Sequence, residues 1–202
     1  MINTIIFDFG DIFINLDKEA PISLFKKLGL SEWNSDLNQL NIQFEKGKIS
    51  EDEFLFGIQE QIPNASKDEI LFAWNSILLD FPLRRLEFLQ KLKKNYRLFL
   101  LSNTDSIHIE TFERENGVSF YSDFYQCFEK VYFSFEMGMR KPDSVIFNYI
   151  IKKHDLFPKR TLFVDDKKEN TDAALLLGLQ VWNLQVGQED VVDLFNKKEF
   201  EL

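Results

Sequence analysis

The chain has 202 residues, 45% of them hydrophobic and 28% charged, which is typical of a globular protein with one good-sized domain or a core domain carrying a smaller insert. The net charge of −9, with no basic patch, excludes the usual nucleic-acid binders, and no apolar run reaches the roughly 20 residues of a membrane span. The single cysteine, Cys127, excludes an internal disulfide and indicates a reducing compartment, so we expect a cytoplasmic protein with a buried, inert thiol.

The first predicted strand covers residues 4–8 and ends in an acid. Its apolar run is rich in β-branched and aromatic residues, which is typical of a buried strand, and Gly10 permits a sharp turn directly after it. A carboxylate at this place costs free energy unless a cation meets it, so Asp8 is either an acidic turn residue or part of a site. Residues 12–17 alternate and predict a hairpin arm or an extended flap.

Residues 18–80 carry helical signals and no strand signal. Apolar spacing predicts a helix over residues 21–28, and two capping boxes at 50–53 and 66–69 open further helices. The segment is therefore expected to form a small helical bundle. We expect the turn at residues 44–48 to face solvent, although it could also point inward.

Strand and helix signals alternate in the rest of the chain. Helices separated by buried strands predict a parallel sheet covered on both faces, so the expected fold class is α/β with a Rossmann-like core. The expected strands are 96–101, 131–133, 161–164 and 180–184, and the expected helices are 83–92, 107–115, 142–151 and 168–177.

Four of the expected strands are each followed at once by polar residues. In open α/β sheets the ligand binds at the carboxyl edge of the strands, so these residues should meet at one pocket. They are Asp8, Ser102 with Asn103, Ser134, and Asp165 with Asp166.

The residue types at this edge point to phosphoryl transfer. Three clustered carboxylates need a cation, and oxygen ligands without a nearby His or Cys favour Mg²⁺. The Ser102 hydroxyl and the backbone N–H groups after it could hold phosphate oxygens, and Lys141 could balance an incoming dianion. In such a site Asp8 would attack phosphorus and become phosphorylated itself.

These segments resemble, in order and spacing, the four motifs of the haloacid dehalogenase (HAD) superfamily. The resemblance implies a core domain of residues 1–16 and 82–202 with an inserted α-helical cap of residues 17–81. It is closest to the bacterial α-D-glucose-1-phosphate phosphatases, which share the glycine of the first motif and a histidine here at His108. The motifs are Asp8-Phe9-Gly10, Ser102-Asn103-Thr104, Gly138-Met139-Arg140-Lys141-Pro142, and Asp165-Asp166 followed by Asn170.

The resemblance also implies roles for individual residues. Asp8 is expected to be the nucleophile and, with the Gly10 carbonyl and Asp166, a ligand of Mg²⁺. Asp165 is expected to hold a metal-bound water. Ser102, Asn103 and Lys141 are expected to bind the phosphate, with Lys141 also steadying Asp8. For His108 we expect a structural place on its helix, and for Asn170 a supporting or capping place.

One position departs from the family pattern. Most phosphatases of the superfamily carry a second aspartate where this chain has Gly10, and that aspartate protonates the leaving oxygen. A general acid typically increases the reaction rate by about 10²–10⁴-fold. Our hypothesis is that the turn at Gly10 swings Asp11 inward as a replacement; the alternative is that Asp11 only fits the turn. A sugar-1-phosphate, whose leaving oxygen is less basic, would suffer least from the loss.

The expected function is therefore hydrolysis of a small phosphorylated metabolite, without nucleic-acid or membrane partners. Two alternatives remain at this point. A haloacid dehalogenase uses the same attacking aspartate without a metal, but the adjacent carboxylates Asp165 and Asp166 argue against a metal-free site. A non-catalytic module that binds phosphorylated metabolites would explain the missing acid.

Overall fold

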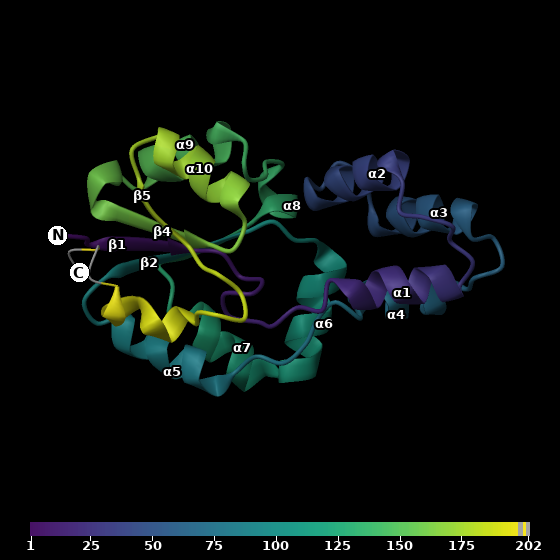
Figure 1. Ribbon diagram of the computed structural model, residues 1–202, viewed down its shortest axis with the longest axis horizontal. Coiled ribbons are helices and arrows are strands. Elements are labelled where there is room, and N and C mark those ends of the chain that lie inside the picture. Colours follow the sequence, from purple (N-terminus) through teal and green to yellow (C-terminus); the bar gives the residue numbers. More distant parts are fainter. Residues whose placement is uncertain (198–199, 201–202) are drawn as a thin grey trace.

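A computed structural model of the chain describes residues 1–197 and 200, and its centre is one parallel sheet of five strands (Figure 1). The strand order is β3-β2-β1-β4-β5, so the first strand lies in the middle with β2 and β4 on either side. This α/β fold is the one predicted. The strands are β1 (Thr4–Phe7), β2 (Arg97–Ser102), β3 (Lys130–Phe133), β4 (Thr161–Asp165) and β5 (Gln180–Asn183).

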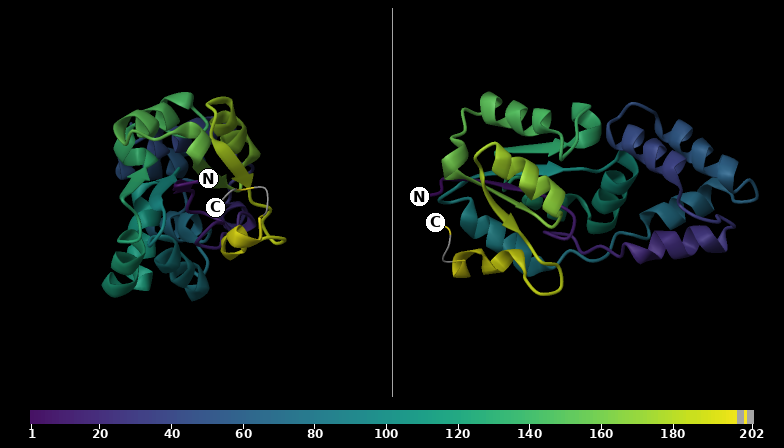
Figure 2. Two further views of the ribbon diagram at one scale, coloured as in Figure 1. Left: turned by 90° about the vertical axis from the view of Figure 1, so that its left-hand side faces the viewer. Right: turned by 45° about the horizontal axis from the view of Figure 1, so that its top comes forward.

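Helices cover both faces of the sheet because the central strands are apolar on both sides. In β1, Ile5 and Phe7 pack into the core beneath α5, α6 and α7, whereas Ile6 packs against α9 and α10 on the other face. Figure 2 shows the two helical layers with the sheet between them. The bounds are α5 (Leu83–Leu92), α6 (Ser106–Asn116), α7 (Val118–Tyr125), α8 (Ser134–Met137), α9 (Ser144–Lys153) and α10 (Lys168–Leu176), with 3₁₀ turns at Pro158–Arg160 and Val191–Asn196.

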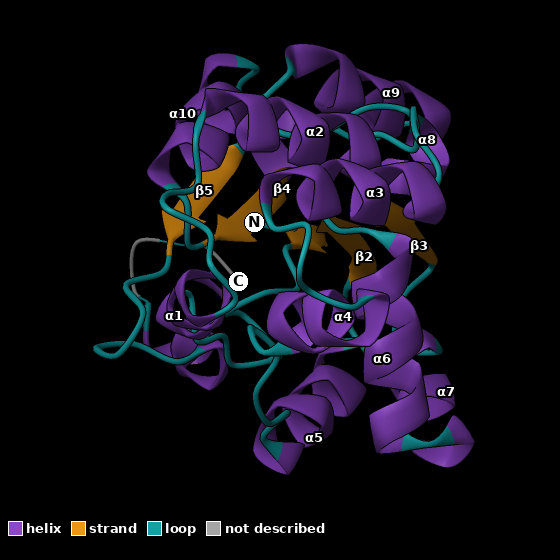
Figure 3. Cartoon of the chain, turned by 90° about the vertical axis from the view of Figure 1, so that its right-hand side faces the viewer, coloured by secondary structure: helices purple, strands orange, loops and turns teal. Residues whose placement is uncertain are grey.

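The remaining four helices gather beyond the carboxyl ends of the strands (Figures 1 and 3). This α1–α4 bundle has an apolar core of its own, built around Phe25, Phe54 and Trp74. Both predicted capping boxes are confirmed, with Ser50 and Ser66 accepting from the third residue of their helices. The helices are α1 (Glu19–Lys27), α2 (Ser35–Glu45), α3 (Glu51–Gln61) and α4 (Lys67–Asn75).

Some local predictions were wrong in part. Residues 12–14 form a turn, because Phe13 points into the core and packs on Phe7 and Phe124, whereas residues 15–17 pair antiparallel with residues 77–80. Helix α9 begins at Ser144 rather than at Pro142, since Asp143 still has extended dihedral angles. Cys127 is buried, as expected. None of the helices in residues 1–197 is long and apolar enough to cross a membrane.

The turn at residues 44–48 is exposed at Gly47 and Lys48, as expected, and it also contacts the core of the protein. A Cβ at Gly47 would lie 2.1 Å from the backbone oxygen of Phe135, and the φ angle of Gly47 is +59°. Next to it, Lys46 forms an ion pair with Asp143 at 3.1 Å. Only glycine permits this close approach of two backbones, and the contact ties the end of α2 to the loop that carries Lys141.

Candidate active site

The register of the sheet brings the predicted residues to one edge. Phe7 lies opposite Val164 and Leu100, so Asp8 follows β1 beside Asp165 at the end of β4, and Ser102 closes β2 on its other side. Single oxygens of Asp8, Asp165 and Asp166 lie within 4.8 Å of one another. β1 runs toward the α1–α4 bundle (Figure 1), so this edge faces the bundle.

Lys141 is the cation that meets these acids. Its ammonium lies 2.7 Å from Asp8 Oδ1 and 2.6 Å from Asp165 Oδ2, and the side chain is 1% exposed. Burial lowers the pKa of this ammonium, but the charges of Asp165 and Asp8 outweigh burial and the net pKa is raised. Asn103 holds the lysine in place, since its amide donates to the Lys141 carbonyl and accepts from the Lys141 N–H.

Both oxygens of the buried Asp165 carboxylate accept hydrogen bonds from the protein. Besides Lys141, the carboxylate accepts hydrogen bonds from the Asn170 side-chain amide and from the Lys167 backbone N–H. Asn170 therefore supports the site through Asp165. Asp166 instead meets Lys18 at 2.9 Å, on the segment that leads into α1.

The acids surround the floor of a hollow of about 310 Å³ between the sheet edge and the bundle. Of the predicted residues, Asp8, Gly10, Ser102, Asn103 and Asp166 line it, while Lys141 and Asp165 are buried beneath them. Sequence reasoning missed most of its other walls, because they come from the α1–α4 bundle or from loops and turns at the sheet edge. These walls include Lys18, Asn41, Glu45, Trp74, Ile77, Leu78, Thr104 and Lys167.

Two predicted residues have other contacts. Ser134, expected at the pocket, is fully buried, where its hydroxyl donates to the Thr104 carbonyl and accepts from the Thr104 N–H. Asp11 does turn inward with a φ of 58°, but its carboxylate accepts from the Leu16 N–H and pairs with Lys18 at 2.7 Å. It lines a different hollow from that of Asp8.

His108, for which a structural place was expected, joins the core to the bundle and also lines the Asp8 hollow. Its Nδ1 lies 3.0 Å from Asp105 Oδ2, and its Nε2 lies 3.1 Å from the Trp74 carbonyl oxygen. Burial lowers the pKa of this imidazole, but Asp105 and the Trp74 carbonyl raise it by more. Both neighbours accept hydrogen bonds, so the doubly protonated ring suits them both.

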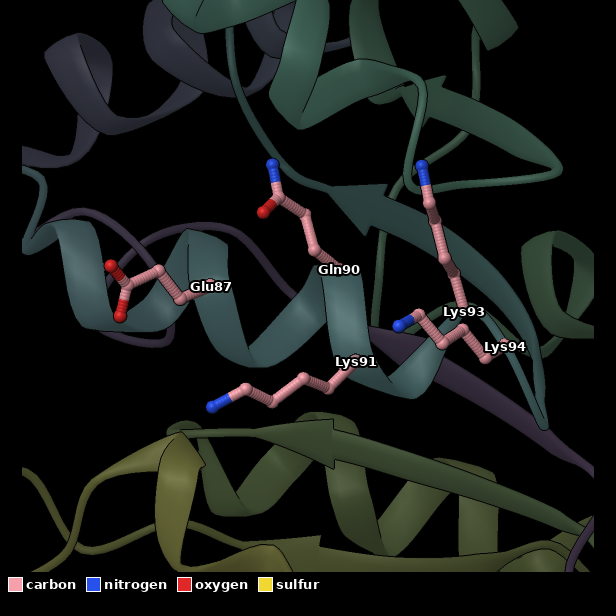
Figure 4. A pocket seen from close by; sticks show the side chains of 5 residues that line it. All are labelled: Glu87, Gln90, Lys91, Lys93 and Lys94. Atoms are coloured by element: carbon pink, nitrogen blue, oxygen red, sulfur yellow. The ribbon is translucent and has the colours of Figure 1, made fainter.

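A second hollow, of about 480 Å³, lies far from these groups on the surface of α5 and the turn after it (Figure 4). Its walls are surface side chains, and none of the residues that follow the strands reaches it. Larger volume does not make it the better site, because it lacks the clustered acids. It is lined by Glu87, Gln90, Lys91, Lys93 and Lys94.

The comparisons with known proteins agree with this geometry. Residues 5–184 match the family model of the haloacid dehalogenase-like hydrolases, and the chain belongs to this family. A D-ribitol-5-phosphate phosphatase from Bacteroides thetaiotaomicron is 29% identical over 195 residues, covering 94% of this chain and 95% of that protein.

Solved structures of a HAD family enzyme from the same organism are also similar. Its magnesium complex has a TM-score of 0.87 at 37% identity and covers 97% of this chain and 99% of that one. The wild-type enzyme with magnesium and inorganic phosphate has a TM-score of 0.82 at 36% identity, and the match covers 94% of this chain and 97% of that one.

Protonation of Asp8 should make the stability of the metal-free protein depend on pH. Burial raises the pKa of this carboxyl, Lys141 lowers it, and Asp165 and Asp166 raise it, to about 7 from the ordinary 3.8. The stability contributed by the bound proton is complete below the unfolded-state pKa and is lost as the pH rises through about 7. Relative to Asp8→Asn, the wild type should lose about 2 kcal/mol of unfolding free energy between pH 5.5 and pH 8.

Urea unfolding of both proteins in EDTA at the two pH values measures this difference. Asp172→Asn is the matched control, because Asp172 is an exposed partner of Lys168 away from the site, and its difference from the wild type should not change with pH. An equal gap between wild type and Asp8→Asn at both pH values would contradict the raised pKa.

Proposed function

We propose that this HAD hydrolase is a Mg²⁺-dependent phosphomonoesterase that acts on a small sugar or polyol phosphate through an aspartyl-phosphate at Asp8. The observation that carries the proposal is the position of the Asp8 carboxylate. It lies at the floor of the hollow beside Asp165 and Asp166, with a buried lysine 2.7 Å away. A hollow of about 310 Å³ is at the small end of ligand pockets, which run from roughly 300 to 1,000 Å³.

The donor set fits the metal. Three carboxylates with oxygens within 4.8 Å of one another suit a hard cation such as Mg²⁺. Asp8, Asp166 and the Gly10 carbonyl would hold it directly, with Asp165 supporting through a water. When bound, Mg²⁺ neutralises the acids and stabilises negative charge on the phosphate oxygens. The magnesium complexes of the similar structures support this assignment.

The chain's own residues then account for the two halves of the reaction. An oxygen of Asp8 attacks phosphorus and forms the aspartyl-phosphate, the ester P–O bond breaks, and the leaving oxygen takes a proton from water to give the alcohol. Lys141 holds the attacking carboxylate and balances the charge of the phosphate, while the Ser102 hydroxyl and the Asn103 backbone N–H bind the phosphate oxygens. Water then hydrolyses the aspartyl-phosphate, releasing inorganic phosphate and restoring Asp8.

The leaving group narrows the substrate class. With Gly10 at the acid's usual place, and Asp11 held by Lys18 and the Leu16 N–H, the chain's first turn offers no free acid to the leaving oxygen. A sugar-1-phosphate such as glucose-1-phosphate needs the least help. The similarity to a D-ribitol-5-phosphate phosphatase supports a polyol phosphate, and both classes are small and hydroxylated.

We also assign residues 17–81 as a cap over a core of residues 1–16 and 82–202. The bundle contributes Asn41, Glu45 and Trp74 to the walls of the Asp8 hollow. Such a cap excludes water from the reaction and limits which leaving groups fit.

Activity should depend on the metal. We expect turnover of an aryl phosphate and of several members of a sugar- and polyol-phosphate panel with Mg²⁺, at least a hundredfold loss in EDTA, and recovery when Mg²⁺ is restored. The rate of phosphate release measures turnover under each of these conditions. Tight binding of the panel without turnover would support a non-catalytic binding module instead, and halide release from 2-haloacids without metal would support a dehalogenase.

A further inference from the structure

Helix α2 forms the roof of the Asp8 hollow with two side chains one helical turn apart. Asn41 and Glu45 both line the hollow, and residues four apart lie on the same side of a helix. Neither follows a strand or belongs to the phosphate-binding end of the site. They therefore lie where the part of the substrate beyond the phosphate must fit.

The roof is held in place by the core. Arg140 Nη2 lies 2.8 Å from Glu45 Oε2, and the Lys46–Asp143 ion pair and the backbone contact of Gly47 with Phe135 follow within two residues. Because these contacts reach the loop that carries Lys141, helix α2 has a defined position relative to Lys141 and Asp8.

The roof offers a hydrogen-bond acceptor that the protein does not use. Asn41 Oδ1 is fully enclosed, yet no donor among the described residues reaches it. An enclosed polar atom without a partner is unfavourable, so a ligand that supplies a donor there gains affinity. Glu45 adds a carboxylate on the same side, its charge offset by Arg140.

The side-chain N–H groups of His108 and Trp74, which also line the hollow, are committed to partners within the protein. His108 commits both ring nitrogens to Asp105 and to the Trp74 carbonyl. The Trp74 indole N–H donates to Asp105 as well, at 3.2 Å. Lys18, Thr104 and Lys167 also line the hollow and carry donors, but Asn41 Oδ1 is an enclosed acceptor without a partner among the described residues, and an acceptor selects groups that carry O–H donors.

We propose that Asn41, with Glu45, binds the hydroxyl groups of the substrate and makes the enzyme select phosphorylated polyols or sugars over alkyl phosphates of equal length. The proposal rests on the phosphatase function above. Asn41 is then a specificity-determining residue, and its amide oxygen is the atom that distinguishes a hydroxylated carbon chain from a bare one.

Two esters with the same number of carbons test the proposal on the wild-type protein. A five-carbon alditol 5-phosphate and n-pentyl phosphate both release a primary alcohol, and only the first has hydroxyls to donate. We expect kcat/KM for the alditol ester to exceed that for the pentyl ester by at least about tenfold. Equal values for the two esters would overturn the proposal while leaving the phosphatase function intact. No hydrolysis of any ester, the aryl phosphate included, would instead refute the phosphatase function.

Variants on α2 then locate the preference. Asn41→Leu has nearly the same size without the acceptor, and we expect it to reduce the alditol-to-pentyl ratio of kcat/KM by about tenfold. Asn41→Asp keeps an acceptor and should preserve that ratio. Gln43→Leu, the same kind of change at an exposed position of α2, should leave both esters as in the wild type. If Asn41→Leu lowers both esters equally, its role is structural and the proposal is wrong.

Discussion

Asp8→Asn should reduce phosphate-ester hydrolysis by at least about 10⁴-fold. The amide nitrogen and oxygen of asparagine carry no negative charge, so the attacking group is lost although the shape of the side chain is kept. Lys141 would then keep Asp165 alone as its ion-pair partner, and the fold should remain because the changed side chain is nearly isosteric. Initial rates on the best substrate of the panel measure the loss.

The covalent step can be tested separately from the rate. Rapid quenching of the wild-type reaction, followed by borohydride reduction, should convert residue 8 to homoserine in peptide maps, because an acyl phosphate is reduced and a free carboxylate is not. Asp172→Asn serves as the control and should keep both the rate and the label. A wild-type enzyme that turns over without any label at residue 8 would show that water attacks phosphorus directly.

The fold could be predicted because the strands that form its centre are short and have apolar middles. Strands β1, β2 and β4 are buried on both faces, so local composition and tertiary burial agree in them. Helix α7 was missed because its residues are mainly aromatic and small, with low helix propensity, and its stability comes from packing around Phe124.

The meeting of Asp8, Ser102, Asp165 and Asp166 at one edge of the sheet was predictable for a geometric reason. Parallel strands end at one edge, so the residues after β1, β2 and β4 meet whatever the helices do. Ser134 follows the same rule in sequence but lies beside Thr104, since the chain after β3 turns at once into α8. Spacing cannot tell a strand-end residue that faces the hollow from one that faces a neighbouring loop.

The roof was not predictable, because it depends on contacts between distant segments. Asn41 and Glu45 reach the hollow only through the docking of α2 on the loop around Arg140 and Asp143. Nothing in the local pattern of α2 distinguishes their face from a solvated one. The close backbone contact at Gly47 has one signal in the sequence, a glycine in a turn, and that signal is shared with ordinary solvent-exposed turns.

Lys141 supports both catalysis and stability, so Lys141→Met should lower the turnover and the unfolding free energy of the protein. The variant leaves Asp8, Asp165 and Asp166 together without the buried ammonium, and removing one partner of a buried ion pair costs about 3–5 kcal/mol. We expect urea unfolding to show a loss of this size in EDTA, and turnover to fall by at least about 10³-fold.

Added Mg²⁺ separates the two effects of Lys141→Met. A divalent cation can neutralise the remaining carboxylates, so it should restore much of the unfolding free energy, but it cannot hold Asp8 in the attacking position as the ammonium does. Lys94→Met, at an exposed position in the turn after α5, is the matched control and should stay within about 0.5 kcal/mol of the wild type (Figure 4). A Lys141→Met protein that is as stable as the wild type in EDTA would mean that the acids do not repel one another in the fold. The same result would remove the electrostatic reason for placing a metal there.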